Sequence, residues 1–245
     1  PLGTGNSFAK ELGLPRPNLL NRHRLLAAAE ALANGRIYRM DVGWITTGEE
    51  YGRFWLLWAG TGVDGYLVDH LEPRPKWSKR LGPLGYLLQS LAHAPGFRAV
   101  SATLTVDGRT FHEPALVLAL ISNCRLYAGG ELELTPQAQL DDGRFELWLF
   151  RGHNAVDVIK YMWQARTKRP FPPQNVTMLP CHSLTIHTEP TMPCQTDGDR
   201  AGKTPITCQL KPKALNLLVP STAPDGLFMQ PGTPLTKFIK NRSGH

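Results

Sequence analysis

The sequence predicts an α+β fold in which the end of an α/β unit precedes a larger β-sandwich or barrel. Helix-forming segments fill the first 35 residues, and short alternating or β-branched segments dominate from Ile37 onward. Turn signals such as Asp107-Gly108 and Asp142-Gly143 separate these segments, as is typical of antiparallel sheets. A chain of 245 residues, 42% of them hydrophobic, is large enough to bury one sizeable core or two small ones.

Two helices are expected near the N-terminus. Residues 7–14 form the first, with Asn6 or Ser7 at the N-cap, where a short polar side chain accepts a backbone N–H. Residues 21–34 form the second, a segment rich in Ala and Leu that ends before Gly35. The texture of the sequence changes after this second helix.

Strands and two further helices make up most of the remaining chain. Alternating and β-branched residues predict strands at residues 37–46, 53–59, 99–106, 115–122, 145–150, 184–187 and 206–219. Helices interrupt them at residues 76–93 and 154–168. The predicted domain is therefore a β-sandwich that carries two or more helices.

A domain boundary is expected near Gly35. We expect residues 1–36 to be the end of an α/β unit, residues 37–220 to be the β-rich domain and residues 221–245 to be a C-terminal extension. The extension is rich in Pro and Gly and polar enough to be loosely held. Because the chain opens at Pro1 without Met, inside a Gly-rich turn, we expect a further piece in front of it.

Composition and charge exclude several classes of protein. No apolar run is long enough to cross a bilayer, and Gly and Pro lack a repeat period. The 4 cysteines show no C-x-x-C spacing, which favours reduced thiols in a cytosolic protein over a disulfide scaffold or zinc ribbon. The net charge of +7 predicts an acidic partner such as nucleic acid, an anionic lipid surface or nucleotide phosphates.

The Gly-rich turn P-L-G-T-G-N leads directly into the first helix. Backbone N–H groups at such a helix start, aided by the helix dipole, can hold a phosphate. Gly3 belongs to this loop, Thr4 adds a hydroxyl donor and Asn6 adds an amide. The alternative is a tight strand-to-helix turn without a ligand, because short Gly patterns are weak signals.

A second candidate segment is A-G-T-G-V-D at residues 59–64, after an apolar strand. Its glycines would let the backbone pass close to another element or to a ligand. Asp64 would either cap a helix that begins near Tyr66 or act on a metal-bound water. Capping is the favoured interpretation.

The third candidate is the longest. It runs from I-S-N-C-R-L-Y-A-G-G at residues 121–130 to P-Q-A-Q-L-D-D-G at residues 136–143. Two carboxylates before a Gly are typical of a hairpin turn. Alternatively, Asp142 would bind a hard cation together with nearby backbone carbonyls, because such cations take oxygen ligands.

The fourth candidate is T-D-G-D at residues 196–199, between two predicted strands. Asp-Gly is a strong hairpin signal, so a structural turn is the default interpretation. A carboxylate of this turn that faces a cleft would alternatively act as a general base.

Histidines and a basic cluster give weaker signals. None of the 8 His shows metal-ligand spacing such as H-E-x-x-H. The cluster around Trp77 is either a solvated helix face or a patch for an anionic membrane surface, and its basic members are Arg74, Lys76, Lys79 and Arg80. No basic motif with interleaved aromatics is present, so we expect no nucleic-acid partner.

Together and in this order, the four segments resemble the diacylglycerol kinase catalytic family, which includes the bacterial lipid kinases and the sphingosine and ceramide kinases. P-L-G-T-G-N-S-F-A resembles the family's P-x-G-T-x-N-D-F-A segment, and A-G-T-G-V-D resembles its G-x-G-x-D segment. The third segment is similar to its N…GGG…P…L-D-D-G stretch, and T-D-G-D to its D-G-E hairpin. The resemblance covers roughly residues 1 to 220.

The resemblance implies an architecture and a missing part. Members of the family combine an N-terminal α/β nucleotide-binding domain with a C-terminal β-sandwich, and the active site lies between them. Residues 1–36 would then be the end of the nucleotide-binding domain. The family's ATP-binding G-G-D-G-T motif does not occur in this sequence, so it would lie upstream of Pro1.

The resemblance also implies roles for individual residues. Thr4 would contact the nucleotide, with Gly3 and Asn6 of the same loop. The structural Mg²⁺ site would consist of the Asp142 carboxylate and two backbone carbonyls, those of Gln139 and Arg144. Asp199 would be the proton acceptor. Ser7 and Asp199 depart from the family pattern, since Asp and Glu usually stand there.

The implied activity is transfer of the γ-phosphoryl group of ATP to a lipid hydroxyl, with Mg²⁺ as cofactor. The partners would be the nucleotide, a lipid substrate at a membrane surface and, as a homodimer, a second copy. Trp55 and Trp58 would either shelter an acyl chain or belong to the core. The chain alone would be inactive. The alternatives are a non-catalytic lipid- or partner-binding β-sandwich module and, with weaker support, a soluble NAD-kinase-like enzyme.

Overall fold

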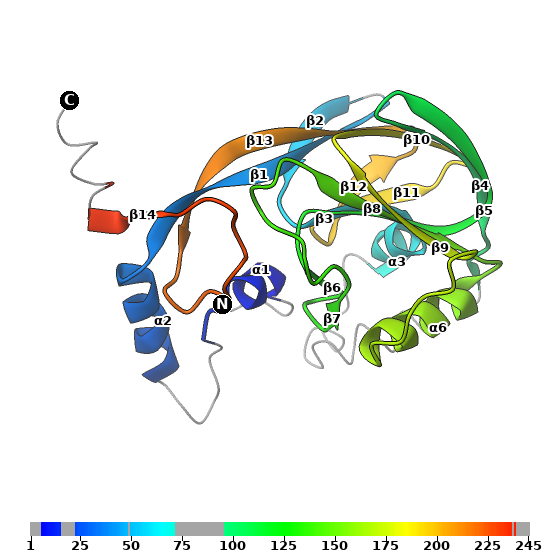
Figure 1. Ribbon diagram of the computed structural model, residues 1–245. Coiled ribbons are helices and arrows are strands. Elements are labelled where there is room, and N and C mark those ends of the chain that lie inside the picture. The colour runs from blue at the N-terminus through cyan, green and yellow to red at the C-terminus, as the bar shows by residue number, and fades with distance from the viewer. Residues whose placement is uncertain (1–5, 16–22, 49, 72–95, 237, 239–245) are drawn as a thin grey trace.

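The computed structural model describes residues 6–15, 23–48, 50–71, 96–236 and 238. One curled antiparallel sheet dominates the molecule, and in the view of Figure 1 the helices lie below its upper strands, one of them inside the curve of the sheet. The helices are α1 (Ser7–Glu11), α2 (His23–Ala33), α3 (Val63–Leu71) and α6 (Ala155–Arg166). The predicted α+β class with a β-sandwich-like domain is confirmed.

The sheet contains 12 strands, and its main path runs β12-β11-β3-β5-β4-β10-β13-β1-β14. Strand β2 pairs with β1, and β8 joins β5 to β9, while β6 and β7 form a separate small ribbon. The bounds are β1 (Arg36–Thr47), β2 (Glu50–Trp55), β3 (Trp58–Gly62), β4 (Val100–Val106), β5 (Arg109–Ser122), β6 (Leu126–Tyr127), β7 (Leu132–Glu133), β8 (Phe145–Arg151), β9 (Val176–Cys181), β10 (Ser183–Glu189), β11 (Pro193–Thr196), β12 (Asp199–Lys203), β13 (Ile206–Val219) and β14 (Thr233–Pro234).

The core is centred on β5. The C-terminal half of β5 pairs with β3 on one side and with β8 on the other. Every residue from Leu116 to Ile121 is at most 4% exposed. A strand covered on both faces favours such a continuous apolar run. Trp55 and Trp58 belong to this core, at 0% and 6% exposure, and the Trp55 ring lies 4.7 Å from that of Phe145.

Some elements differ from the expectations drawn from the sequence. The strand expected at residues 53–59 is two strands, β2 and β3, because the chain bends at Leu56 and Leu57. Strand β5 begins at Arg109 rather than at residue 115, and β9 was not expected. The helix expected at residues 76–93 and the basic cluster around Trp77 lie outside the described residues.

The described part of the C-terminal extension is packed against the sheet instead of being loosely held. Leu227 is 2% exposed, and the Phe228 ring stacks on Tyr38 with centroids 4.3 Å apart. Strand β14 then pairs with the start of β1. The boundaries at residues 36 and 220 stay predictions.

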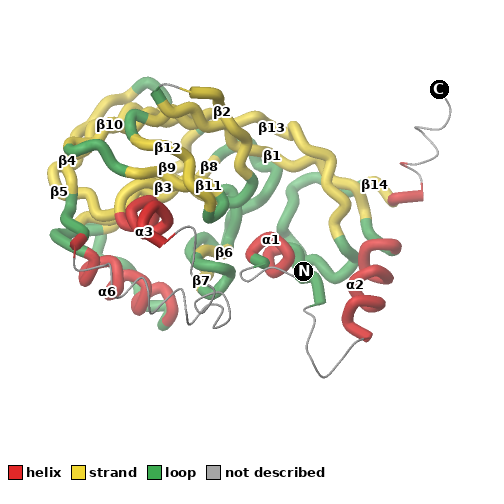
Figure 2. Tube along the Cα trace, turned by 180° about the vertical axis from the view of Figure 1, so that it is seen from behind, coloured by secondary structure: helices red, strands yellow, loops and turns green. Residues whose placement is uncertain are grey.

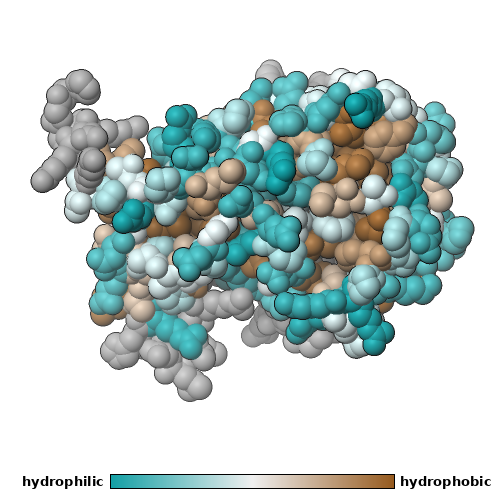
Figure 3. Space-filling view, viewed as in Figure 1, coloured by the Kyte–Doolittle hydropathy of each residue, from teal (hydrophilic) through white to brown (hydrophobic). Residues whose placement is uncertain are grey.

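Seen from behind, α1, α3, α6 and the β6–β7 ribbon still lie on the same side of the sheet (Figure 2). The surface is a mosaic in which hydrophobic residues gather over part of the sheet (Figure 3). No helix within the described ranges is both long enough and apolar enough to cross a membrane.

Candidate functional site

The side-chain amide of Asn123 joins the third and fourth candidate segments. Asn123 directly follows β5 and is 1% exposed. Its Nδ2 donates to the backbone oxygens of Asp41, at 2.9 Å, and Leu56, at 3.1 Å. Its backbone N–H donates to Leu57 O at 2.8 Å. One buried residue therefore connects strand β1 to the bend between β2 and β3.

Asp41 extends this connection to the Asp-Asp-Gly turn. It lies at a β-bulge of β1, where the register against β13 shifts, and is fully buried. Its carboxylate accepts hydrogen bonds from Gly143 N at 2.7 Å and Lys213 N at 2.6 Å. Its own N–H donates to Leu140 O at 2.7 Å. The turn that holds Asp142 is thus fixed from both ends.

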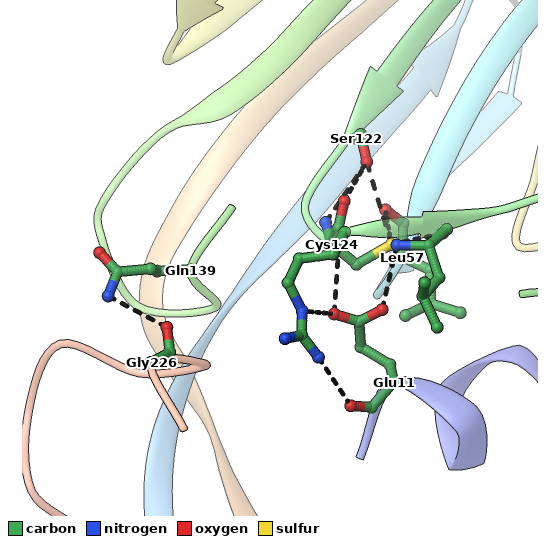
Figure 4. A network of polar contacts seen from close by, with 8 residues as sticks. Glu11, Leu57, Ser122, Cys124, Gln139 and Gly226 are labelled. Atoms are coloured by element: carbon green, nitrogen blue, oxygen red, sulfur yellow. Dashed lines mark hydrogen bonds and ion pairs between the residues drawn. The ribbon is translucent and has the colours of Figure 1, made fainter. Parts of the chain in front are cut away.

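Asp142 and Arg144 of the predicted metal site lie together. Asp142 is 5% exposed at its side chain, and its carboxylate accepts from Arg144 N at 3.2 Å and Arg144 Nε at 3.0 Å. Gln139 makes a different contact, because its Nε2 donates to Gly226 O at 3.2 Å (Figure 4). Only the backbone carbonyl of Gln139 was expected to bind the metal, so this side-chain contact leaves the prediction standing.

Charged side chains near this turn shift the pKa values of its carboxyl groups. Burial raises the pKa of the Asp142 carboxyl, the Arg144 hydrogen bonds and charge lower it, and the nearby Asp41 raises it further. Burial, together with Asp142, also raises the pKa of Glu146 to about 7. The charge of Arg144 lowers the pKa of both Asp142 and Glu146. One carboxylate with backbone oxygens and waters is a donor set that suits Mg²⁺. Among the described residues, no group of three or more His, Cys, Asp or Glu side chains forms a metal cage.

Asp197 braces the bend that breaks the expected strand. The residue is exposed as a whole, yet its carboxylate accepts from the N–H groups of Leu56, Leu57 and Trp58 at 2.8, 2.8 and 3.2 Å. Its own N–H donates to Trp58 O at 2.9 Å. Asp197 therefore has a structural role, as a turn residue should.

Asp199, the predicted proton acceptor, has a different environment on the same hairpin. Its side chain is 78% exposed at the start of β12, and the facing cation is Arg53, whose Nη2 lies 3.6 Å from Asp199 Oδ2. Gly198 between the two aspartates has a φ of +92°, a conformation that favours glycine. The hairpin thus presents the Asp199 carboxylate to solvent, where it is free of the backbone contacts that hold Asp197.

A buried pair of hydrogen-bonded side chains, Gln195 and Asp64, supports this hairpin. Gln195, 2% exposed, accepts from Gly198 N at 2.9 Å and donates through Nε2 to Asp64 Oδ2 at 2.9 Å. Tyr127 Oη also donates to that oxygen at 3.4 Å. A Cβ at Gly60 would lie 2.3 Å from it, so any larger residue there would displace the Asp64 carboxylate. Burial raises the pKa of Asp64 to about 6 despite the hydrogen bond from Gln195.

Asp64 was expected to cap a helix that begins near Tyr66, and this expectation is wrong because the helix begins before Asp64. Helix α3 begins at Val63, so Asp64 lies in its first turn and accepts from Gly65 N at 2.7 Å. The same carboxylate also binds Gln195. The glycines of this segment do permit a close approach, as expected.

Helix α1 is tied to the residues that follow Asn123. Glu11, 1% exposed, accepts from Arg125 N, Arg125 Nε and Leu126 N at 3.2, 2.9 and 3.1 Å. Figure 4 shows Glu11 pointing from α1 toward the segment of Ser122 and Cys124. Asn6 occupies the N-cap position in a left-handed conformation and makes no side-chain capping bond. Gly3 and Thr4 lie outside the described residues.

Sequence patterns missed Glu11, Asp41 and Gln195. An aspartate between apolar neighbours in M-D-V was a usable signal, because it marks a bulge or a buried partner. Glu11 and Gln195 gave no such signal, since their side-chain partners Arg125 and Asp64 are more than 100 positions away.

Comparison with known proteins gives this geometry a family. Residues 59–219 match the family model described as YegS C-terminal NAD kinase beta sandwich-like domain, which is more than half of the chain. The chain belongs to this family. Its resemblance to the diacylglycerol kinase and bacterial lipid kinase group is thereby confirmed.

Relatives of the YegS-type domain cover most of the chain. Diacylglycerol kinase of Bacillus subtilis (strain 168) is 27% identical over 206 residues, 84% of this chain and 63% of that protein. Diacylglycerol kinase of Mycobacterium tuberculosis is 28% identical over 221 residues, 90% of this chain and 68% of that protein. A probable lipid kinase YegS-like of Chromohalobacter salexigens is 28% identical over 220 residues, 90% of this chain and 66% of that protein. The chain thus spans about two thirds of the length of these relatives.

Solved structures show the same fold. A crystal structure from Bacillus anthracis str. Sterne, assigned to a diacylglycerol kinase, matches 91% of this chain with a TM-score of 0.69 and 20% identity. The match covers 69% of that structure's chain. A second crystal structure of a diacylglycerol kinase from the same organism matches 89% of this chain and 65% of its own, with a TM-score of 0.57 and 19% identity.

Replacing Asp197 with Asn is expected to destabilise the folded chain by about 1–2 kcal/mol, because the amide turns a donor toward one of three backbone N–H groups. Chemical denaturation measures this change. Asp199→Asn, on the same hairpin but exposed, is the matched control and should change stability by about 0.5 kcal/mol or less. Equal stability of the two variants would contradict the bracing role of Asp197.

The stability of the chain should also carry a pH-dependent contribution from Asp64. Its folded pKa of about 6 exceeds the ordinary value of 3.8, so the folded state binds the proton more tightly. This contribution is present below about pH 4 and is lost as pH rises through 6, an amount of about 3 kcal/mol. Urea unfolding across pH 4 to 7 should show that the free energy of unfolding falls less with rising pH for Asp64→Asn than for the parent chain. Parallel profiles would contradict this assignment.

Proposed function

We propose that this chain is the β-sandwich half of an ATP-dependent lipid kinase that phosphorylates a hydroxyl of diacylglycerol or a related lipid. The observation that supports this most is the Asn123 connection. It joins the Asp142 turn and the Asp197-Gly198-Asp199 hairpin, which the family resemblance links to Mg²⁺ and to proton transfer. The comparisons add relatives named as lipid kinases.

In this proposal Asp199 accepts the proton of the attacking hydroxyl. Its exposed position lets a substrate hydroxyl approach, and Nη2 of Arg53 lies 3.6 Å from its carboxylate. Gln195 and Asp197 hold the hairpin and act as positioning residues. Because the hairpin is anchored at both ends, the base is held in place before substrate binds.

Nucleotide binding is assigned to the N-terminal part. Gly3, Thr4 and Asn6 would contact ATP at the start of α1, and residues 1–36 would belong to the nucleotide-binding domain. The Asp142 carboxylate and the backbone carbonyls of Gln139 and Arg144 would hold Mg²⁺, which would supply neutralisation of phosphate charge. The kinase would be cytoplasmic, associate peripherally with the membrane that holds its substrate, and form a homodimer.

A non-catalytic lipid-binding module is the second candidate. Two observations favour it: Ser7 stands where the family has Asp, and Asp199 replaces the longer Glu. A shorter carboxylate reaches less far toward a hydroxyl. The two candidates differ in one assay, because a binding module would associate with lipid without ATP turnover.

Activity tests the role of Asp199. The assay uses a longer protein, in which a nucleotide-binding part with the G-G-D-G-T motif precedes this chain. In that protein, Asp199→Asn should lower kcat about 10²- to 10⁴-fold and leave the KM for lipid little changed. Asp225→Asn, an exposed aspartate of the C-terminal extension, is the control. Near-normal turnover of Asp199→Asn would remove this residue from the mechanism.

Asp199→Glu tests the reach of the side chain. The 245-residue chain alone should be inactive.

Thermal unfolding with Mg²⁺ tests the Asp142 site. Saturating Mg²⁺ should raise the Tm of the chain by about 5–10 °C, because a ligand bound to the folded state alone stabilises it. Asp142→Ala should abolish this rise, whereas Asp225→Ala should keep it. A rise that persists in Asp142→Ala would place the cation elsewhere.

A further inference from the structure

Helix α6 has an exposed apolar face in addition to its buried one. The buried side, which packs on the core, consists of Ala155, Val158 and Tyr161. On the outer side, Val156, Ile159, Met162 and Trp163 are 56%, 43%, 37% and 64% exposed. Val156, Ile159 and Trp163 follow one another at spacings of three and four, so they form one stripe along the helix.

Basic side chains border this stripe. The segment 155–169 holds four basic residues and one acidic residue. All four basic residues are exposed, and they are Lys160, Arg166, Lys168 and Arg169. Asp157 is paired with Lys160 at 3.0 Å, and Glu133 of β7 lies 3.4 Å from Lys168. Hydrophilic residues border the lower right of the molecule in Figure 3, where Figure 1 places α6.

We propose that α6 docks the protein on an anionic lipid surface. The stripe would enter the boundary between headgroups and acyl chains, and the basic residues would contact lipid phosphates. Trp163, the most exposed member of the stripe, is a residue type favoured at such an interface. This inference rests on the proposed function, because a kinase that acts on membrane lipids must work at a bilayer.

Charge argues for lipid over a second copy of the chain. A symmetric contact through α6 would bring two segments of the same positive charge together, which is unfavourable. An anionic bilayer neutralises that charge and takes up the apolar stripe at the same time. Helix α6 lies at the margin of the molecule in both views (Figures 1 and 2).

Vesicle binding by the 245-residue chain tests this inference. The chain should sediment with phosphatidylcholine vesicles that contain phosphatidylglycerol, more weakly in high salt, and poorly with pure phosphatidylcholine. Trp163→Ser and Arg169→Glu should each weaken binding roughly tenfold. Trp163→Phe, which keeps an apolar ring, should restore most of the affinity.

Matched controls lie away from α6. Phe54→Ser replaces a side chain of β2 that is 58% exposed. Arg109→Glu reverses a charge at one end of the β4–β5 hairpin, whose other end adjoins α6 through the Arg98–Asn154 bridge. Both should bind vesicles as the parent chain does. Circular dichroism of every variant checks that it is folded.

Three results would overturn the inference. The first is vesicle binding by Trp163→Ser and Arg169→Glu that equals that of the parent chain, and the second is equal binding of the parent chain to both vesicle types. The third is a parent chain that does not bind vesicles but forms a dimer, which Trp163→Ser abolishes. Failure of the proposed function would look different. Vesicle binding through α6 without lipid phosphorylation by the longer protein would remove the kinase assignment and leave the docking surface. If the longer protein phosphorylates lipid, the α6 variants do not change that activity, and the chain does not bind vesicles, the kinase assignment stays and the docking surface is removed.

Discussion

Two hydrogen bonds from one buried amide hold the candidate site together. Asn123 Nδ2 donates to the backbone of Asp41 on β1 and of Leu56 at the bend between β2 and β3. Removing a buried donor's partners costs about 1–3 kcal/mol, so both segments are held to this point. Through Asp41 the bond fixes the Asp142 turn, and through the Leu56 bend it meets the carboxylate of Asp197. Side chains separated by well over 100 residues thereby share one frame.

Aspartates in this frame have the same chemistry but different uses. Asp41 and Asp64 are buried and accept backbone or amide hydrogens. For Asp64 the raised pKa shows that burial outweighs those bonds, so this carboxylate costs stability in its ionised form. Asp199 is exposed to solvent instead. Asp41 and Asp64 thus lie inside the molecule, whereas the carboxylate proposed as the proton acceptor lies outside.

Sequence patterns predicted most of the strands because alternation and Asp-Gly turns are local signals. The bend at Leu56 was missed because F-W-L-L-W reads as one apolar run, and the break depends on a carboxylate 140 residues away. Strand β9 was missed because it contains Pro180, which argues against a strand. The fold tolerates this proline because β9 lies at an edge and pairs only with β8. The turn pattern alone treats Asp197 and Asp199 alike, although the family resemblance assigns the proton acceptor to Asp199. The three backbone partners of Asp197 show which of the two braces the bend.

Residues just beyond Asn123 extend the frame toward the N-terminus. Glu11 binds the backbone of Arg125 and Leu126, so α1 is held by the same segment that holds the two turns. A ligand at the start of α1 would therefore bind to an element that is already positioned relative to Asp142 and the hairpin. Ser7 and Asp199 stand outside these buried contacts. Their departures from the family pattern change the groups offered to a substrate and leave the supporting frame intact, so a longer carboxylate at position 199 would alter reach without disturbing the fold.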